Sequence, residues 1–219
     1  MTDPLIPPSP GAEAYAIDED QGDVFTINDP FALFADWLEL AGTMEPNDAN
    51  AMALASVDEN RMPNVRMVLL KDINACGLTF YTNLESAKGE ELKQTQQAAA
   101  CFHWKSLRRQ VRFRGAINSV TDDEADAYFS TRARGAQLGA HASAQSRSLE
   151  SRETLEKEIA RLDEKWVGAE IPRPDHWSGF RLVPLEIEFW VNRPYRLHDR
   201  LVYRRDTPKS DWVTQHLYP

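Results

Sequence analysis

The spacing of apolar residues changes along the chain, and the first clear period is helical. Asn28 and Asp29 are good N-cap residues, and Pro30 after them suits the first position of a helix. Apolar side chains then recur every three or four residues, at Phe31, Phe34, Trp37, Leu38 and Ala41. Gly42 follows this run. We therefore expect an amphipathic helix that begins at Pro30 and ends at Gly42.

Beyond residue 50 the period shortens to two, and short segments rich in β-formers are separated by turn-forming residues. The predicted strands are 51–58, 64–72, 77–82, 98–104, 108–120, 179–191, 195–205 and 211–217. Helical composition returns between 82 and 97, in 121–134 and in 148–167. Antiparallel strands interleaved with short helices predict an α+β fold, mainly antiparallel β, built as a small barrel with flanking helices.

Two of these segments carry sharper local patterns. Polar residues occupy every second position of the strand over 108–120, so one of its faces is unusually polar; they are Arg108, Gln110, Arg112 and Arg114. In the helix over 121–134, Thr121 and Glu124 have the spacing of a capping box.

The first 25 residues differ in composition from the rest. Four prolines lie within the first ten residues, and six acids precede residue 24 with no Lys or Arg among them. Such a segment buries too little apolar surface to offset the entropy cost of ordering it. We predict a flexible, acidic, Pro-rich arm over 1–25 and one folded domain over 26–219.

The whole chain has 25 basic and 34 acidic residues, a net charge of −9. This charge argues against nucleic acid as a partner, because non-specific affinity for nucleic acid comes mainly from neutralising phosphates with Lys and Arg. Without the six acids of the arm, the folded domain is close to neutral. Local clusters of cations in it are therefore informative.

Several classes of protein are disfavoured. The two cysteines, Cys76 and Cys101, have no metal-ligand spacing, so we predict no metal site and a reducing, cytoplasmic location. The start of the chain lacks the pattern of a signal peptide, and no window approaches the roughly 20 apolar residues of a membrane span, so we expect no membrane partner. Neither a GxGxxG nor a GxxxxGK[ST] motif occurs, so any phosphate must be held by side chains.

Two basic segments are candidates for anion binding. Arg66 and Lys71 bracket four apolar residues, and the two-residue period places them on opposite faces, so one phosphate cannot take both from one face. The alternative is that they are snorkelling ends of a buried strand. Thr82, Ser86 and Lys88 lie near the start of a predicted helix, where N–H groups, hydroxyls and a cation form an anion site. An ordinary capped helix with a nearby lysine is the alternative there.

A third basic segment lies near the C-terminus. Arg193, Arg196, His198 and Arg200 crowd into eight residues beside Trp190. In a continuous strand the last three of these four share one face and repel one another. An anionic ligand or partner against that face would remove the repulsion, so we predict a functional site here.

Five motifs together resemble the pyridoxamine 5'-phosphate oxidase family. They are RMVLLK, FYTNLESAKGEEL, RRQVRFRG, YFSTRARGAQLGAHASAQS and EFWVNRPYRLHDRLVY, in the family's order, and the resemblance covers about residue 28 to the C-terminus. It implies an FMN-binding split β-barrel with flanking helices that forms a homodimer, with one FMN in each of two clefts at the subunit interface.

The resemblance also implies roles for particular residues, some of them acting from the other subunit. The implied FMN contacts are Arg66, Met67, Val68, Leu69, Leu70, Lys71, Tyr81, Thr82, Lys88, Gln110, Gln145, Ser146, Trp190 and Arg200. The implied substrate contacts are Lys71, Tyr128, Arg132, Arg196 and His198, with Arg196 and His198 also catalytic. Arg66 and Lys71 would then face opposite sides because they serve two different phosphates.

The activity that the resemblance implies is oxidation of pyridoxamine or pyridoxine 5'-phosphate to pyridoxal 5'-phosphate, with O2 as the electron acceptor and H2O2 as a product. Two positions depart from the family's pattern. Ala87 stands where a second basic residue is common, and Ala136 stands where a serine usually completes the substrate-phosphate site. The alternatives are a related flavin oxidase with another substrate, of the phenazine-pathway type, and a non-catalytic flavin-binding protein.

Overall fold

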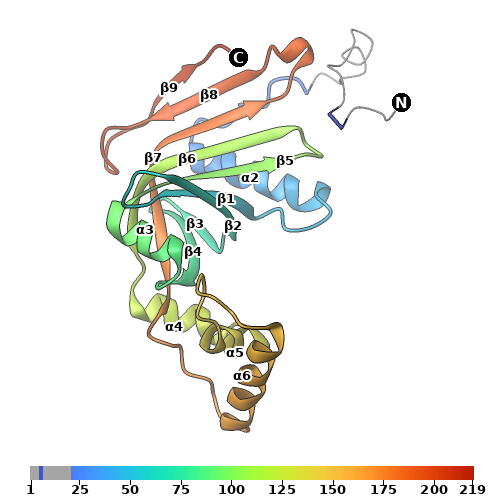
Figure 1. Cartoon of the computed structure of the whole chain (residues 1–219). Helices are drawn as coiled ribbons and strands as arrows, with labels where there is room; N and C mark the ends of the chain where they lie inside the picture. The colour runs from blue at the N-terminus through green and yellow to red at the C-terminus, as the bar shows by residue number, and fades with distance from the viewer. Residues whose placement is uncertain (1–4, 7–20) are drawn as a thin grey trace.

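The computed structural model describes residues 5–6 and 21–219 of the chain (Figure 1). The helices are α2 (Pro30–Met44), α3 (Ala87–Thr95), α4 (Asp122–Ser130), α5 (Arg134–Ala142) and α6 (Arg152–Lys165), with a 3-10 turn η1 (Pro194–Arg196). The strands are β1 (Ala51–Val57), β2 (Pro63–Leu69), β3 (Asp72–Asn74), β4 (Gly77–Asn83), β5 (Gln97–Trp104), β6 (Arg109–Ser119), β7 (Trp177–Val191), β8 (Asp199–Arg204) and β9 (Val213–His216). This confirms the predicted α+β class.

The strands form one curled antiparallel sheet in the order β2-β1-β5-β6-β7-β4-β3, and β8 and β9 continue from β7. The long strand β7 has two successive partners on one side. Residues 177–182 pair with β4, and residues 186–191 pair with β8. Pro184 lies between these stretches and has no N–H to donate, and the register of β6 shifts opposite it, between Arg114 and Gly115. The sheet therefore divides at Pro184 into two halves, one in which β7 pairs with β4 and one in which it pairs with β8.

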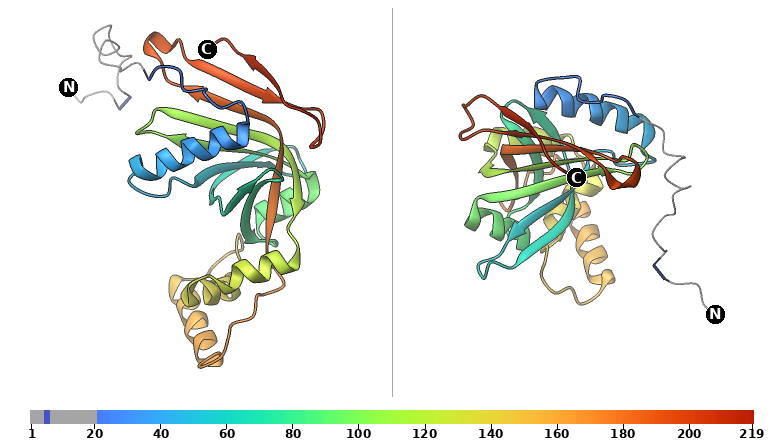
Figure 2. Two further views of the ribbon diagram at one scale, coloured as in Figure 1. Left: turned by 180° about the vertical axis from the view of Figure 1, so that it is seen from behind. Right: turned by 90° about the horizontal axis from the view of Figure 1, so that it is seen from above.

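Aromatic side chains fill the core between the sheet and α2, which lies against one face of the sheet (Figure 2). Phe34 of α2 packs edge-on against Phe102 and Phe113, with ring centroids 4.9 and 5.0 Å apart. Trp37 packs edge-on against Phe189 at 5.1 Å. A second, smaller core joins α4, α5 and α6 to the start of β7; its buried members are Phe129, Leu138, Leu162, Ile171 and Trp177.

Local capping signals are confirmed. Asp29 caps α2 by accepting a hydrogen bond from the N–H of Ala32, and Pro30 begins the helix. Thr121 and Glu124 form the predicted capping box of α4. The end of α2 was predicted too early, because the helix continues past Gly42 to Met44.

Several predicted elements were wrong in extent. The strand predicted over 64–72 ends at Leu69, and the helix predicted over 148–167 begins only at Arg152. The segment 121–134 is not one helix: α4 ends at Ser130, and α5 follows after an extended Ala133. The segment 195–205 is not one strand either, because Pro194 starts a 3-10 turn and β8 begins only at Asp199. Most of the predicted arm lies outside the described residues. Its last residues are described, and there Gln21 accepts a hydrogen bond from Arg109 and donates one to the carbonyl of Leu107.

None of the helices in the described part combines the length and the apolar character needed to cross a bilayer.

The close approach of β6 and β7 at the bulge yields a stability prediction. A Cβ on Gly115 would overlap the carbonyl oxygen of Val183 and lie 2.8 Å from the Cα of Pro184. We expect Gly115→Ala to lower the free energy of unfolding by about 1–3 kcal/mol or more, measured by urea denaturation. Gly42→Ala is the matched control. Its Cβ meets nothing within 4 Å, and it should stabilise α2 by up to about 1 kcal/mol. Equal effects of the two variants would contradict this account of the bulge.

Candidate functional site

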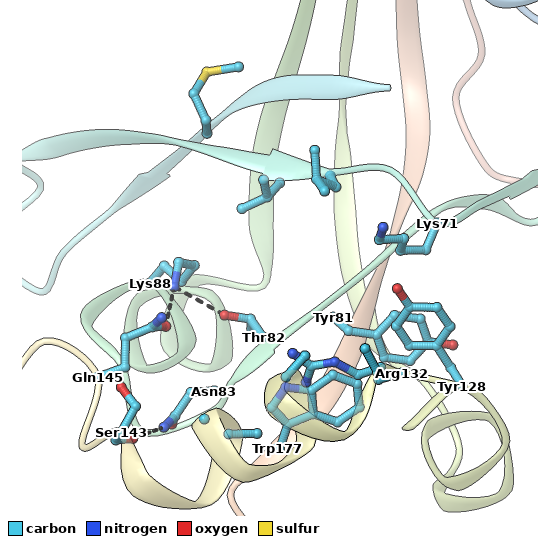
Figure 3. A pocket seen from close by; sticks show the side chains of 17 residues that line it. Lys71, Tyr81, Thr82, Asn83, Lys88, Tyr128, Arg132, Ser143, Gln145 and Trp177 are labelled. Atoms are coloured by element: carbon cyan, nitrogen blue, oxygen red, sulfur yellow. Dashed lines mark hydrogen bonds between the residues drawn. The ribbon is translucent and has the colours of Figure 1, made fainter. Parts of the chain in front are cut away.

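Helices α4, α5 and α6 pack together, and we call them the helical module. A cavity of about 690 Å³ lies between the sheet and this module, a size suited to a small organic ligand. Strands β2 and β4 form one side, and α3, α4, α5 and the start of β7 form the rest. The sequence-predicted residues that line it are Met67, Val68, Leu69, Lys71, Tyr81, Thr82, Lys88, Tyr128, Arg132 and Gln145. We call this cavity the pocket. Figure 3 shows Lys88 at one end and Lys71, Tyr128 and Arg132 at the other.

The Lys88 end is built by the turn that leads from β4 into α3. Ser86 caps this helix by accepting a hydrogen bond from the N–H of Gly89, and Lys88 follows in the first turn. The Lys88 amine donates to Thr82 Oγ1 at 3.1 Å and to Gln145 Oε1 at 2.6 Å (Figure 3). It also donates to Ser86 Oγ at 3.3 Å. All three partners are neutral oxygen atoms.

This position is unfavourable for a cation. Burial lowers the pKa of Lys88, and the nearby Arg66 guanidinium lowers it further. The N-terminus of a helix also carries a partial positive charge. A negatively charged ligand at this end would offset all three effects, so the Lys88 end is suited to bind an anion.

The other end of the pocket contains Lys71, Tyr128 and Arg132. The Arg132 guanidinium stacks 4.7 Å from the ring of Trp177, and its NH1 atom is buried with no hydrogen-bond partner among the described residues. Burial lowers the pKa of Arg132. The Lys71 amine lies 5.9 Å from the centroid of the Tyr128 ring. This end therefore offers a second, separate group of donors for an anion.

Three parallel aromatic rings form a wall beside the Arg132 end. The ring centroids of Tyr81 and Tyr128 are 4.1 Å apart, and those of Tyr81 and Trp177 are 5.4 Å apart, with interplanar angles of 14° and 4°. Burial and the nearby Glu124 raise the pKa of Tyr81. On the opposite side, Met67 and Leu69 expose apolar side chains from the edge strand β2. A flat apolar ring between the two cationic ends would be compatible with these surfaces.

Some predicted contacts do not reach the pocket in this chain. The Arg66 guanidinium instead donates to Glu91 at 2.9 Å and to the carbonyl of Leu54 at 3.3 Å. The side chain of Leu70 belongs to the core. Ser146 follows Gln145 in sequence but does not line the cavity. The expectation that Arg66 and Lys71 point away from each other agrees with the structure, since only Lys71 faces the pocket.

The remaining predicted residues gather elsewhere, in what we call the second cluster. Gln110, Trp190 and Arg200 lie side by side on β6, β7 and β8. The His198 ring lies 4.5 Å from the ring of Trp190. Arg196 is exposed in η1, where it and the preceding Tyr195 both have positive φ, of 62° and 56°. The prediction that Arg196, His198 and Arg200 share one strand face was therefore wrong, because the chain turns before β8 begins.

The protonation of His198 follows from its surroundings. Burial lowers its pKa, and the Arg196 guanidinium lowers it further. The backbone N–H of Arg193 donates to Nδ1 at 3.2 Å. A neutral ring with Nδ1 as acceptor carries its proton on Nε2, which is left as a donor.

The pocket and the second cluster are far apart within one protomer. Trp177 lines the pocket at the start of β7, and Trp190 lies in the second cluster near its end. Thirteen residues separate them, which is roughly 40 Å along a strand at about 3.3 Å per residue. A single small ligand cannot touch both groups in one protomer.

The sequence did not indicate every residue of the pocket. Trp177, Asn83 and Ser143 line it, as do the small side chains of Ala133, Ala136, Gly139 and Ala140. All of these except Trp177 lie within motifs already quoted, and Ala136 was named there as a departure from the family's pattern, so the motifs could have indicated them. Trp177 lies outside every quoted motif and joins the pocket only because α4, α5 and α6 pack against the start of β7.

Comparisons with known proteins identify the same family that the sequence motifs resemble. A family model described as "Pyridoxamine 5'-phosphate oxidase" matches residues 43–166, and one described as "Pyridoxine 5'-phosphate oxidase C-terminal dimerisation region" matches residues 177–219. The pyridoxine/pyridoxamine 5'-phosphate oxidase of Maricaulis maris is 58% identical over 219 residues, covering 99% of each chain. The protein of that name from Brucella canis is 58% identical over 191 residues, covering 87% of this chain and 94% of its own.

A solved structure is also similar. PhzG from Burkholderia lata, in complex with tetrahydrophenazine-1-carboxylic acid, superposes with a TM-score of 0.83 at 32% identity. The match covers 89% of this chain and 95% of that chain. The split-barrel architecture is therefore shared with this relative.

The unfavourable position of Lys88 yields a prediction for the ligand-free protein. We expect Lys88→Met to raise the free energy of unfolding by about 0.5–2 kcal/mol at neutral pH, because it removes a half-buried cation that has only neutral partners. The pKa of Lys88 is lower in the folded state, so the protonated lysine opposes folding. This cost disappears as pH rises toward the ordinary lysine pKa, and the gap between variant and wild type should close with it. The control is Lys93→Met, an exposed lysine of the same helix, which should change stability by less than about 0.5 kcal/mol. A destabilised Lys88→Met would contradict the account.

Proposed function

This chain belongs to the pyridoxamine 5'-phosphate oxidase family, and from this we infer that it oxidises pyridoxamine 5'-phosphate, pyridoxine 5'-phosphate or both to pyridoxal 5'-phosphate with FMN as cofactor. The observation that carries the proposal is the pair of cationic ends in one pocket. FMN and the substrate each bring one phosphate and one flat ring system. Two phosphates need two separate groups of donors, and two ring systems need apolar surface between those groups.

The residues of the pocket fit FMN at the Lys88 end. A phosphate dianion supplies the negative charge that the surroundings of the Lys88 amine lack, and the Thr82 hydroxyl and the first N–H groups of α3 are donors at the same place. Met67 and Leu69 offer apolar surface to a ring system. Ala87 supplies no second cation. The negative charge of the FMN phosphate is therefore offset by Lys88 and by more distant groups such as Arg66.

The residues at the other end fit the substrate phosphate. Arg132 has a buried N–H group without a partner in the described part, and Lys71 and Tyr128 lie next to it. Ala136 lines the same end and offers no hydroxyl. The phosphate is thus bound by two cations and a phenol. This leaves the substrate ring between the aromatic wall and the flavin.

FMN, when bound, would accept a hydride from the substrate carbon that bears the amine or hydroxyl, and O2 would take the two electrons and two protons to give H2O2. With the amine substrate, water hydrolyses the resulting imine to the aldehyde and ammonia. Arg196 would bind the substrate and stabilise negative charge on its ring. His198, neutral and with its Nε2 proton available, would donate a hydrogen bond that orients the ring.

The active site is completed by a second copy of the chain. Arg196, His198, Trp190 and Arg200 lie in the region matched by the dimerisation model, so the protein is a homodimer through this part. The separation along β7 means that these residues cannot serve the pocket of their own protomer. We therefore assign them to the pocket of the partner, with FMN at the subunit interface.

A related oxidase acting on another substrate is the second candidate, since the chain also resembles PhzG and lacks a hydroxyl at Ala136. Retention of Lys71, Tyr128 and Arg132 at one end of the pocket favours a phosphorylated substrate.

The direct test is flavin content and turnover of the purified protein. We expect about one FMN per protomer by visible absorption, and peroxide release with pyridoxamine or pyridoxine 5'-phosphate. Arg196→Ala should lower kcat by about a hundredfold or more with little change in the Kd for FMN. Lys88→Ala should weaken FMN binding by about tenfold or more, because it removes a charge-assisted hydrogen bond. A flavin-loaded protein that oxidises neither phosphate would rule out the proposed substrate, and a protein that takes up no FMN would rule out the cofactor.

Mixed dimers test whether the site is shared. We expect Lys88→Ala and Arg196→Ala protomers, each inactive alone at limiting FMN, to recover about a quarter of wild-type activity when co-expressed in equal amounts. Half of the dimers are then mixed, and each has one intact site out of two. The control pair is Lys88→Ala with Arg132→Ala, which both alter the pocket and leave no intact site in any dimer. No recovery by the test pair would show that each protomer builds its own site. Recovery by the control pair would show that Lys88 and Arg132 do not serve the same site.

A further inference from the structure

The outer face of β7 carries two glutamates, and each joins an arginine of β6 to an arginine of β8. Glu186 accepts hydrogen bonds from Arg114 at 3.3 Å and from Arg204 at 2.8 Å. Two residues along the strand, Glu188 accepts from Arg112 and, through both of its oxygens, from Arg200. The two units have the same chemistry on the same three strands. Only the Glu188 unit contains a residue of the proposed active site.

The Glu188 unit differs from its neighbour in burial. The side chain of Glu188 is 4% exposed, against 19% for Glu186. Burial acts to raise the pKa of Glu188, but the hydrogen bonds from Arg200 and Arg112 outweigh it and lower the pKa, so the carboxylate stays ionised. An ionised carboxylate buried between strands is costly, and an apolar residue would pack there at least as well. Stability alone therefore does not explain Glu188.

The geometry of Arg200 indicates what Glu188 does. Arg200 donates from Nε to Glu188 at 3.0 Å and from NH2 to Glu188 at 3.2 Å, and its NH1 donates to the carbonyl of Tyr218 at 2.9 Å. A guanidinium has five N–H donors. Three are engaged, so its plane is fixed and two donors are left. Arg200 is the register partner of Trp190 on the neighbouring strand.

We propose that Glu188 is a positioning residue of the flavin site, which holds the guanidinium of Arg200 in the orientation that contacts FMN in the partner's pocket. The proposal rests on the proposed function. Glu188 itself touches no ligand and acts through Arg200. Arg112 supports it from the other side by sharing the charge of the same carboxylate.

The test compares Glu188→Gln with Glu186→Gln. Each variant removes one negative charge from the same face of β7 and keeps the shape of the side chain. Titration of the apoprotein with FMN, followed by quenching of flavin fluorescence, gives the Kd. We expect Glu188→Gln to raise the Kd about tenfold, because a fixed charge-assisted contact is lost, and Glu186→Gln to change it less than about twofold.

A double-mutant cycle separates positioning from a general loss of structure. In an Arg200→Ala background, Glu188→Gln should change the Kd for FMN by less than about twofold, because the residue it positions is gone. Glu186→Gln serves as the control and should have the same small effect in both backgrounds. Light scattering shows whether the variants remain dimeric. If Glu188→Gln does not fold, Glu188→Asp keeps the charge, withdraws it from Arg200, and should raise the Kd in the same direction.

The proposal is overturned if the Kd of the Glu188→Gln variant for FMN lies within twofold of wild type or equals that of the Glu186→Gln variant. It is also overturned if Glu188→Gln raises the Kd as much in the Arg200→Ala background as in wild type, or if FMN affinity is lost only because the dimer dissociates. In each of these cases, the proposed function still holds if the wild-type protein binds FMN and oxidises the phosphorylated substrate. Wild-type protein that binds no FMN overturns both.

Discussion

The structure depends on one strand that serves two halves of a sheet. β7 pairs with β6 along its length, while its other edge pairs first with β4 and then with β8. The change of partner occurs at Pro184, opposite the bulge at Gly115, where backbones approach too closely for a side chain. One strand thereby begins at the pocket and ends at the second cluster. Trp177 and Trp190 both stand on this strand, and their separation along it is the basis of the proposed site shared between two protomers.

The pocket contains buried cations that lower the stability of the ligand-free chain. Lys88 is half-buried near a helix N-terminus with neutral partners, and Arg132 has a buried donor without a partner among the described residues. Arg200 is the opposite case, because Glu188 fixes it at the cost of a buried charge. These features have one explanation in common. In the proposed function, an anionic ligand supplies the missing charge at the first two, and orientation toward that ligand is the proposed reason for the third.

Elements with local signals were predictable from the sequence. Asp29 and Pro30 located the start of α2, and the capping box located the start of α4, because caps act within one turn of helix. α5 was missed because two glycines in nine residues weaken its intrinsic helix propensity, and its packing against α6 compensates. The segment 195–205 kept the alternation of a strand, but strand structure begins only where pairing with β7 does.

The sequence by itself determined the class of fold, the acidic balance and, with its motifs, most of the residues that line the pocket. Only the tertiary structure decided that the proposed site residues divide into two groups, that Trp177 joins the first, and that Glu188 holds Arg200 in the second. The reason is that strand pairing is non-local. Arg112 and Glu188 are 76 residues apart, and Glu188 and Arg200 are 12 apart, so their side chains meet only when β6, β7 and β8 align in one register.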